Sequence, residues 1–267
     1  MKRTATREPI RLLLPAFVAT GLLLLPLLAL LVRAPWSSLI EVLEDGPALT
    51  ALWLSIRTAA VATLISVILG IPLAWVLARS NMRGTSILRA LVALPMVLPP
   101  VVGGVALLTL LGRRGILGQY LDDWFGVTIP FTTTAVVIAQ VFVAMPFLVL
   151  SVDGSLRARD NRLEDIAATF GANRWQAFRS VTIPLAIPAI GAGAVLAFAR
   201  SLGEFGATIT FAGNYPGTTQ TMPTAIYLAM ESEPEVAIAM SVILVSISAL
   251  VLIVLRSHWL SAFGSTK

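Results

Sequence analysis

Long apolar runs without a charged residue dominate the chain. They cover residues 12–32, 58–78, 90–112, 124–152, 180–199 and 236–255. A helix needs about 20 apolar residues to cross a bilayer, so each run is long enough to span one. The pattern predicts an all-α membrane protein with six transmembrane helices, centred near Leu23, Ala62, Pro99, Phe142, Gly193 and Leu244.

Two of the predicted spans extend into charged sequence. The second is expected to start near Ala48 and to take Arg57 into the membrane. The fifth is expected to continue past Arg200 and Glu204. Charges inside a membrane are costly and mark functional or structural sites, so these three charged residues become candidates.

The first run and the basic residues together set the topology. The run is too long for the apolar core of a signal peptide, and Pro35 would follow the only suitable cleavage site at Ala34, so we expect an uncleaved helix. Most Lys and Arg residues lie in the N-tail, the second and fourth loops and the C-tail. The opposite side carries only Arg33, Arg113 and Arg114. The positive-inside rule therefore predicts that both termini are cytoplasmic.

Composition removes several classes of protein. Hydrophobic residues make up 57% of the chain and charged residues 12%, and the mean hydropathy is +0.88, which excludes an ordinary soluble domain. With no Cys and a single His258, near the C-terminus, we expect no metal site and no catalytic residue. The only lysines are Lys2 and Lys267, so no Walker A motif exists. The net charge of +5 is attributed to topology and not to a nucleic-acid partner.

Proline and glycine interrupt the third and fifth spans. Pro99 and Pro100 lie mid-span with Gly103 and Gly104 after them, and four glycines thin the fifth span. One interpretation is close helix packing with kinks. The other is a movable pathway, because missing backbone hydrogen bonds are tolerated at membrane depth beside protein or a water-filled cavity. The density of these residues favours the pathway.

The fourth loop predicts two short helices outside the bilayer. The first is capped by Asn161 with Glu164 at its third position and is stopped by a left-handed Gly171. Asn173 and Gln176 repeat the cap for the second. An apolar stripe is expected on the first helix and exposed aromatics on the second; these are Leu163, Ile166, Ala167 and Phe170, then Trp175 and Phe178. Pro184 and Pro188 open the fifth span. Periodicity alone leaves a protein partner and the lipid surface equally open.

Residues 164–188, EDIAATFGANRWQAFRSVTIPLAIP, resemble the EAA loop of ABC importer permeases. Asp165, Ile166 and Ala167 occupy its Glu-Ala-Ala positions, Gly171 matches its glycine, and Pro184 matches its proline. The resemblance implies the type I ABC importer permease architecture and a loop that docks on a separate ATPase, which would bind ATP and Mg. The coupling residues it implies are Glu164, Asp165, Ile166, Ala167, Phe170, Gly171, Trp175 and Pro184. Glu164 and Asp165 are further expected to stabilise the helix start and to meet basic groups on the partner.

Residues 70–79, 94–104 and 199–227 resemble molybdate permeases more specifically. The resemblance implies a homodimer, two cytoplasmic ATPase subunits and an extracytoplasmic molybdate-binding protein at the bacterial plasma membrane. Sulfate or tungstate remains an alternative substrate, because sulfate permeases share the core around Arg200 and Glu204. The expected layout is an N-tail, first span and short loop at 1–47, a permease domain at 48–256 with its coupling loop at 157–182, and a C-tail at 257–267.

The candidate pathway combines charges, hydroxyls and helix breaks. Arg200 and Glu204 share a helix face. Either they form a structural pair, with or without Arg57 as a third member, or the arginines draw an anion. Thr208 and the stretch 218–221 offer hydroxyls, although Pro216-Gly217 within that region is also typical of a type II turn. The candidate pathway residues are Arg57, Arg200, Glu204, Thr208, Pro99 and Pro100. A rival class is a proton-coupled transporter that uses Glu204. An intramembrane enzyme lacks evident machinery.

Overall fold

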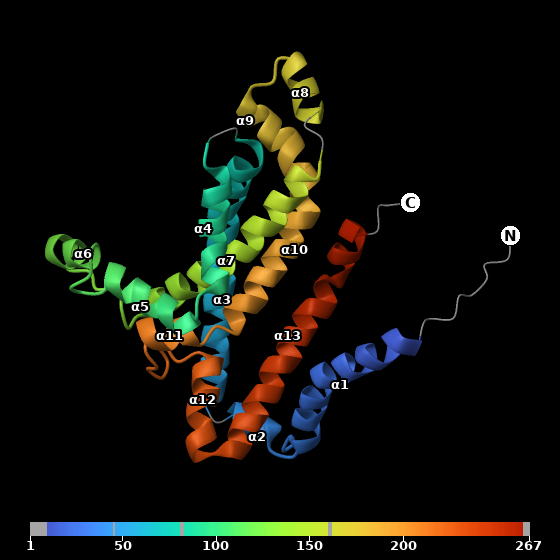
Figure 1. Cartoon of the computed structure of the whole chain (residues 1–267). Coiled ribbons are helices and arrows are strands. Elements are labelled where there is room, and N and C mark those ends of the chain that lie inside the picture. The colour runs from blue at the N-terminus through green and yellow to red at the C-terminus, as the bar shows by residue number, and fades with distance from the viewer. Residues whose placement is uncertain (1–9, 45, 81–82, 160–161, 264–267) are drawn as a thin grey trace.

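The computed structural model describes residues 10–44, 46–80, 83–159 and 162–263. Every regular element in these residues is helical, which confirms the all-α prediction (Figure 1). The helices are α1 Ile10–Arg33, α2 Leu39–Glu44, α3 Pro47–Arg79, α4 Thr85–Val97, α5 Pro100–Leu111, α6 Gly118–Phe125, α7 Thr133–Arg157, α8 Arg162–Thr169, α9 Arg174–Ala177, a π-helix η1 Phe178–Thr182, α10 Ile183–Leu202, α11 Gly206–Phe211, α12 Met222–Ser232 and α13 Pro234–Phe263.

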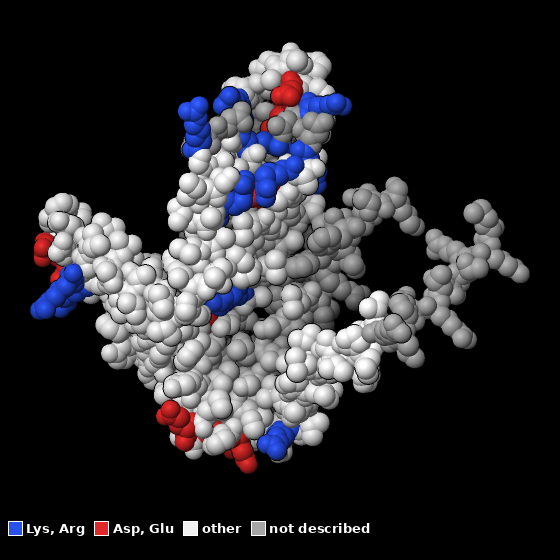
Figure 2. Space-filling view, in the orientation of Figure 1, with Lys and Arg blue, Asp and Glu red and all other residues white. Residues whose placement is uncertain are grey.

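The described chain has 5 helices that are long and apolar enough to cross a membrane, and 6 spans if the bent pair α4 and α5 counts as one. Four elements, α3, α4, α7 and α10, form the long bundle of Figure 1. We call the end that carries α8 and α9 the loop end, and the end that carries α2 and α12 the hairpin end. Figure 2 shows many basic side chains and a few acidic ones at the loop end, and acidic side chains beside one basic group at the hairpin end.

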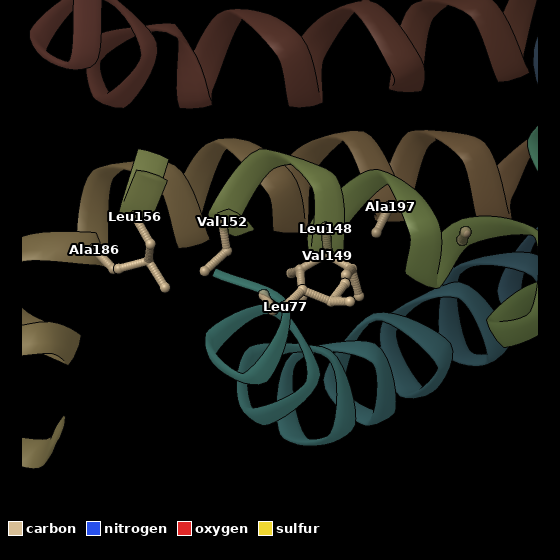
Figure 3. Close-up of a cluster of buried hydrophobic side chains, with 9 residues drawn as sticks. Leu77, Leu148, Val149, Val152, Leu156, Ala186 and Ala197 are labelled. Carbon is tan, nitrogen blue, oxygen red and sulfur yellow. The ribbon is translucent and has the colours of Figure 1, made fainter. Parts of the chain in front are cut away.

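The core of the bundle lies where α7 packs between α3 and α10. Leu148, Val149 and Val152 of α7 are fully buried there, against Leu77 of α3 and Ala186 of α10 (Figure 3). Between membrane helices such contacts stabilise through van der Waals packing, because lipid is as apolar as these side chains.

Glycines bring these helices into close contact. A Cβ added to Gly70 would lie 2.7 Å from Leu148 Cδ2, and one added to Gly193 would lie 3.0 Å from Leu148 Cα. Small residues of this kind let helix backbones approach closely in a membrane. Close packing therefore accounts for part of the glycine content of the spans.

The third span is broken. It begins at Thr85, and its two parts, α4 and α5, meet at an angle of 113° around Leu98 and Pro99. Pro100 begins α5, where its missing N–H costs no intrahelical hydrogen bond. The predicted interruption of the third span at the prolines is therefore confirmed.

The fifth span also departs from expectation at both ends. It does not run as one helix past Glu204, because α10 ends at Leu202 and α11 resumes at Gly206. At its start, α9, η1 and α10 form one continuous span over Arg174–Leu202. The second short helix is therefore the first turn of this span and not a separate element. The ring of Pro184 would clash with a carbonyl one turn earlier in a regular α-helix, and the wider π-turn just before it keeps the helix continuous.

Two apolar elements remain uncovered within the chain. None of the apolar window of α1 is buried, although α1 contacts α13. No residue of α4 is buried either. One side of α4 is attached to the bundle. Leu88 and Val92 pack against the core cluster. Arg89 Nε lies 2.9 Å from Oδ2 of the fully buried Asp153 on α7, and Arg89 Nη2 donates to the carbonyl of Leu77 at 2.9 Å.

Candidate functional site: coupling loop and intramembrane pair

Gly171 ends α8 as predicted. Its φ is +86°, a left-handed value that is cheap only for glycine. The N–H of Ala172 donates to the carbonyl of Ala167 at 3.0 Å, and the N–H of Gly171 donates to that of Ala168 at 3.0 Å. These two hydrogen bonds are those of a Schellman motif. The predicted cap at Asn161, at the start of α8, lies outside the described residues.

The capping box of α9 is confirmed. Asn173 Oδ1 accepts from the N–H of Gln176 at 2.9 Å, and Gln176 Oε1 accepts from the N–H of Asn173 at 2.8 Å. Two backbone donors at the helix start are thereby satisfied. The turn between α8 and α9 is therefore fixed at both sides, by a glycine stop and by a reciprocal cap.

The apolar stripe of the loop is largely exposed. Leu163 and Ile166 are each about half exposed, Phe170 is 87% exposed and Trp175 is 67% exposed. The expected exposure of Phe178 is wrong. Only 9% of it is accessible, because its ring packs edge-on against Trp75 of α3, with centroids 5.6 Å apart. Ala167 is half-buried and Asp165 is exposed.

Glu164 turns towards its own chain. Its Oε1 accepts from Thr182 Oγ1 at 2.9 Å and lies 3.2 Å from Nη2 of Arg79. The expected meeting of Glu164 with basic groups on a partner therefore does not fit its position, whereas the exposed Asp165 remains free for that role. Arg79 and Thr182 carry no sequence motif, so sequence reasoning missed both; the only signal was their position at helix ends next to the loop.

Arg200 and Glu204 form an ion pair at the C-terminal end of α10, where the fifth span breaks. Nη1 of Arg200 lies 2.6 Å from Oε2 of Glu204. The Arg200 side chain is 29% exposed and that of Glu204 is 1% exposed. The other carboxylate oxygen, Oε1, accepts from the N–H of Ala207 at 2.7 Å and so fixes the start of α11.

Buried polar atoms gather around this pair. Ser201 Oγ, Glu204 Oε2 and Thr208 Oγ1 are buried and have no hydrogen-bond partner among the described residues. The 2.6 Å contact to Arg200 is thus an ion pair without hydrogen-bond alignment. Arg57 does not join the pair: it lies exposed on α3, and no ion pair links it to another described residue.

The two broken spans meet at this corner. A Cβ on Gly206 would lie 2.6 Å from Cβ of Pro100, and one on Gly104 would lie 2.7 Å from Cβ of Thr210. The structure therefore brings the proline break of the third span next to α11, which carries Thr208 and follows Glu204. The corner thus gathers the candidate pathway residues Pro99, Pro100, Arg200, Glu204 and Thr208.

The hydroxyls of residues 218–221 serve a turn. Gly217 has φ +74°, and the N–H of Thr218 donates to the carbonyl of Tyr215 at 3.1 Å, which is a type II turn as the sequence suggested. Thr219 Oγ1 is buried and accepts from the N–H of Tyr215 at 2.9 Å. These groups are engaged by the fold itself. Within the described residues no cluster of three or more His, Cys, Asp or Glu side chains could hold a metal.

A helical bundle that crosses the membrane several times, with a rigid apolar loop outside it and broken helices inside it, is typical of transport proteins. The model of the family "binding-protein-dependent transport system inner membrane component" matches residues 66–258. The chain belongs to this family, and it is a multi-pass protein of the bacterial plasma membrane.

Several relatives are similar over most of their length. The chain is 47% identical over 240 residues to the molybdenum transport system permease protein ModB of Mycobacterium bovis, covering 90% of each chain. It is 42% identical over 221 residues to ModB of Escherichia coli, covering 83% of this chain and 96% of the relative.

Solved structures show the same fold. A bacterial ABC transporter that imports the acidic polysaccharide alginate matches with a TM-score of 0.72 at 17% identity, covering 97% of this chain and 96% of that chain. The same transporter has also been solved with a pentasaccharide-bound periplasmic protein. An inward-facing methionine transporter, MetNI, matches with a TM-score of 0.62, covering 79% and 96%. The fold is that of a type I ABC importer permease.

Proposed function

We propose that the chain is the membrane subunit of an ATP-driven importer and that it translocates molybdate. The single observation that carries the importer class is the exposed apolar surface of α8 and α9, held rigid by the Schellman stop at Gly171 and the capping box at Asn173. A rigid apolar surface outside the membrane suits a protein partner. The substrate rests on the similarity to the molybdenum permeases of other bacteria; tungstate or sulfate is the alternative.

The partner at this surface is an ATPase, which binds ATP and Mg and performs hydrolysis. This chain is then a non-catalytic subunit without a cofactor of its own. One docking loop per chain and paired ATPases imply a homodimer with two ATPase subunits around a two-fold axis. The uncovered apolar faces of α1 and α4 support the dimer, because they offer surface to a second copy as well as to lipid.

The loop end is proposed to face the cytoplasm. Support comes from the arginines gathered there, which include Arg83, Arg157, Arg159, Arg174 and Arg179 (Figure 2). An extracytoplasmic molybdate-binding protein would then dock at the hairpin end. In support of such a partner, a structural relative has been solved in complex with a periplasmic protein.

This orientation can be tested with single cysteines, because the chain has none of its own. Ser180 at the loop end and Ser232 at the hairpin end are both exposed. In intact cells a membrane-impermeant maleimide should label Ser232→Cys and should label Ser180→Cys only after the cells are opened. The reverse pattern would contradict the orientation.

The function is tested by reconstitution. The chain is purified together with its ATPase partner and placed in liposomes with the binding protein outside and ATP inside. Molybdate should accumulate, and omission of ATP or of the binding protein should stop it. Competition by tungstate and sulfate then ranks the three anions. Uptake that needs a proton gradient but no ATPase would instead support the transporter that uses Glu204; the engagement of both Glu204 oxygens argues against this.

A further inference from the structure

Helix α8 stands off from the bundle that it serves. None of its eight residues is buried. Two cavities flank it: one of about 270 Å³ on the side of Trp75, Arg174 and Phe178, and one of about 450 Å³ on the side of Leu156, Val181 and Leu185. Apolar packing therefore does little to fix α8 against the membrane helices.

One polar cluster separates the two cavities. Glu164, Arg79 and Thr182 line both of them. At its centre Oε1 of Glu164 accepts from Thr182 Oγ1 at 2.9 Å and from Arg79 Nε at 3.3 Å. The Arg79 side chain is 10% exposed and Thr182 is 2% exposed, so both donors are held in place by their surroundings.

The two donors belong to two different membrane helices. Arg79 is the last residue of α3, and Thr182 is the last residue of the π-turn that leads into α10. Hydrogen bonds to a charged group are stronger than those between neutral groups. A single carboxylate oxygen on α8 thus connects the exposed loop to the ends of α3 and α10.

The π-turn η1 is the point at which the connected span can bend. Wide π-turns interrupt the regular hydrogen-bond ladder and occur often at functional positions in helices. A force on α8 that pulls Thr182 would bend the span at η1, whereas the capped turn at Gly171 and Asn173 keeps the loop itself rigid.

We propose that Glu164 is a positioning residue that transmits displacement of α8 to α3 through Arg79 and to α10 through Thr182. The inference rests on the proposed function, because it assigns the source of the displacement to an ATPase docked on the exposed stripe. Glu164 couples the motion of the loop to that of the membrane spans, and it does not contribute to the affinity for the ATPase.

The test compares substrate transported per ATP hydrolysed in the reconstituted complex. Thr182→Val keeps shape and removes the hydroxyl; Glu164→Leu removes both contacts, and Glu164→Gln keeps a weaker acceptor. We expect Thr182→Val and Glu164→Leu to lower the ratio by about fivefold or more, as the loss of one or two kcal/mol would. The ratio for Glu164→Gln should lie between those of these two variants and that of the wild type. Thr182→Ser keeps the hydroxyl and should retain the wild-type ratio.

The matched control is Ser180→Ala, in the same π-turn. The Ser180 hydroxyl is exposed and donates only to the carbonyl of Gln176, within the same helix, so this variant should keep the wild-type ratio. Co-purification of the ATPase should be unchanged in all variants, which a simple docking contact would not allow. If Thr182→Val and Glu164→Leu both retain the wild-type ratio, the proposal is overturned. If the wild-type complex shows no ATP-driven uptake, the proposed function fails instead, and the two failures are thereby distinguished.

Discussion

Polar and apolar groups are arranged in opposite ways at the two ends of α10. At the loop end the polar groups are hydrogen-bonded: Asn173 and Gln176 cap each other's backbone N–H groups, and Thr182 donates to Glu164. The large apolar side chains of Phe170 and Trp175 are exposed instead. The polar groups of this surface are satisfied without a partner, whereas its exposed apolar side chains would be stabilised by a partner that covers them.

At the other end the apolar groups are covered and two hydroxyls are not satisfied. Leu202 and Phe211 are almost completely buried, and the Glu204 carboxylate is paired with Arg200. Ser201 and Thr208 each bury a hydroxyl oxygen that lacks a hydrogen-bond partner in the described part of the chain. Leaving such an atom unpaired costs about 1–3 kcal/mol. The loop end is thus organised to bind a protein, and the corner at α11 is organised around polar groups that the fold alone does not require.

The largest expected effect follows from the burial difference within the ion pair. Arg200→Met leaves the Glu204 carboxylate, 1% exposed, without its cation and should destabilise the protein by about 3–5 kcal/mol. Glu204→Leu should cost less, because Arg200 retains 29% exposure to solvent. The double variant Arg200→Met, Glu204→Gln keeps an acceptor for the N–H of Ala207 and should recover expression. Thermal unfolding in detergent measures all three.

A different outcome would give the pair another role. If Arg200→Met folds normally and loses only uptake, then Arg200 draws the anion and does not stabilise the fold. Normal folding together with normal uptake would exclude both roles.

The buried and exposed aromatics of the loop end give the second contrast. Phe178→Ala removes a ring that is 9% exposed and should destabilise the permease by about 3 kcal/mol. Phe170→Ala removes a ring that is 87% exposed and should leave the unfolding temperature unchanged. It should instead weaken ATPase binding by about tenfold, if Phe170 is one of the few residues that dominate the interface. Unchanged ATPase affinity would mean that the stripe faces lipid.

Gly171 tests the geometry of the same surface. A β-branched residue in the left-handed region costs about 1–2 kcal/mol, and no atom lies within 4 Å of an added Cβ, so the effect is purely conformational. Gly171→Val should leave the protein inserted and dimeric but should abolish ATPase docking or stimulated hydrolysis. Gly171→Asn is the control, because Asn tolerates this conformation. If Gly171→Val supports full ATP-driven uptake, the loop is not the coupling element.

The sequence predicted local features and missed those that depend on distant contacts. The Gly171 stop, the Asn173 cap, the turn at Pro216 and the break at Pro99 are each specified by residues a few positions apart, and each is confirmed. The ion pair of Arg200 and Glu204 is also local, with i, i+4 spacing.

The misses have a shared physical cause. Phe178 was expected to be exposed because Trp75, which covers it, lies on another helix about a hundred positions earlier. The same holds for two polar contacts between different elements, namely the hydrogen bond from Thr182 to Glu164 and the ion pair between Arg89 and Asp153. No short motif records such contacts, and only the packing of α3, α7 and α10 creates them.

The smallest expected effect concerns the hydroxyls of α11. Thr208 Oγ1 is buried without a hydrogen-bond partner among the described residues, so Thr208→Val keeps the shape and should not lower stability; removal of an unpaired buried group is neutral or slightly stabilising. Thr210→Val is the matched control, because Thr210 Oγ1 donates to the carbonyl of Gly206 at 2.8 Å within its own helix. If the polar corner serves translocation, Thr208→Val should slow molybdate uptake by about threefold to tenfold, the equivalent of about 1 kcal/mol, at unchanged unfolding temperature. Equal uptake rates for both variants would show that the corner is structural, and the contrast between the two ends of α10 would then rest on the loop end alone.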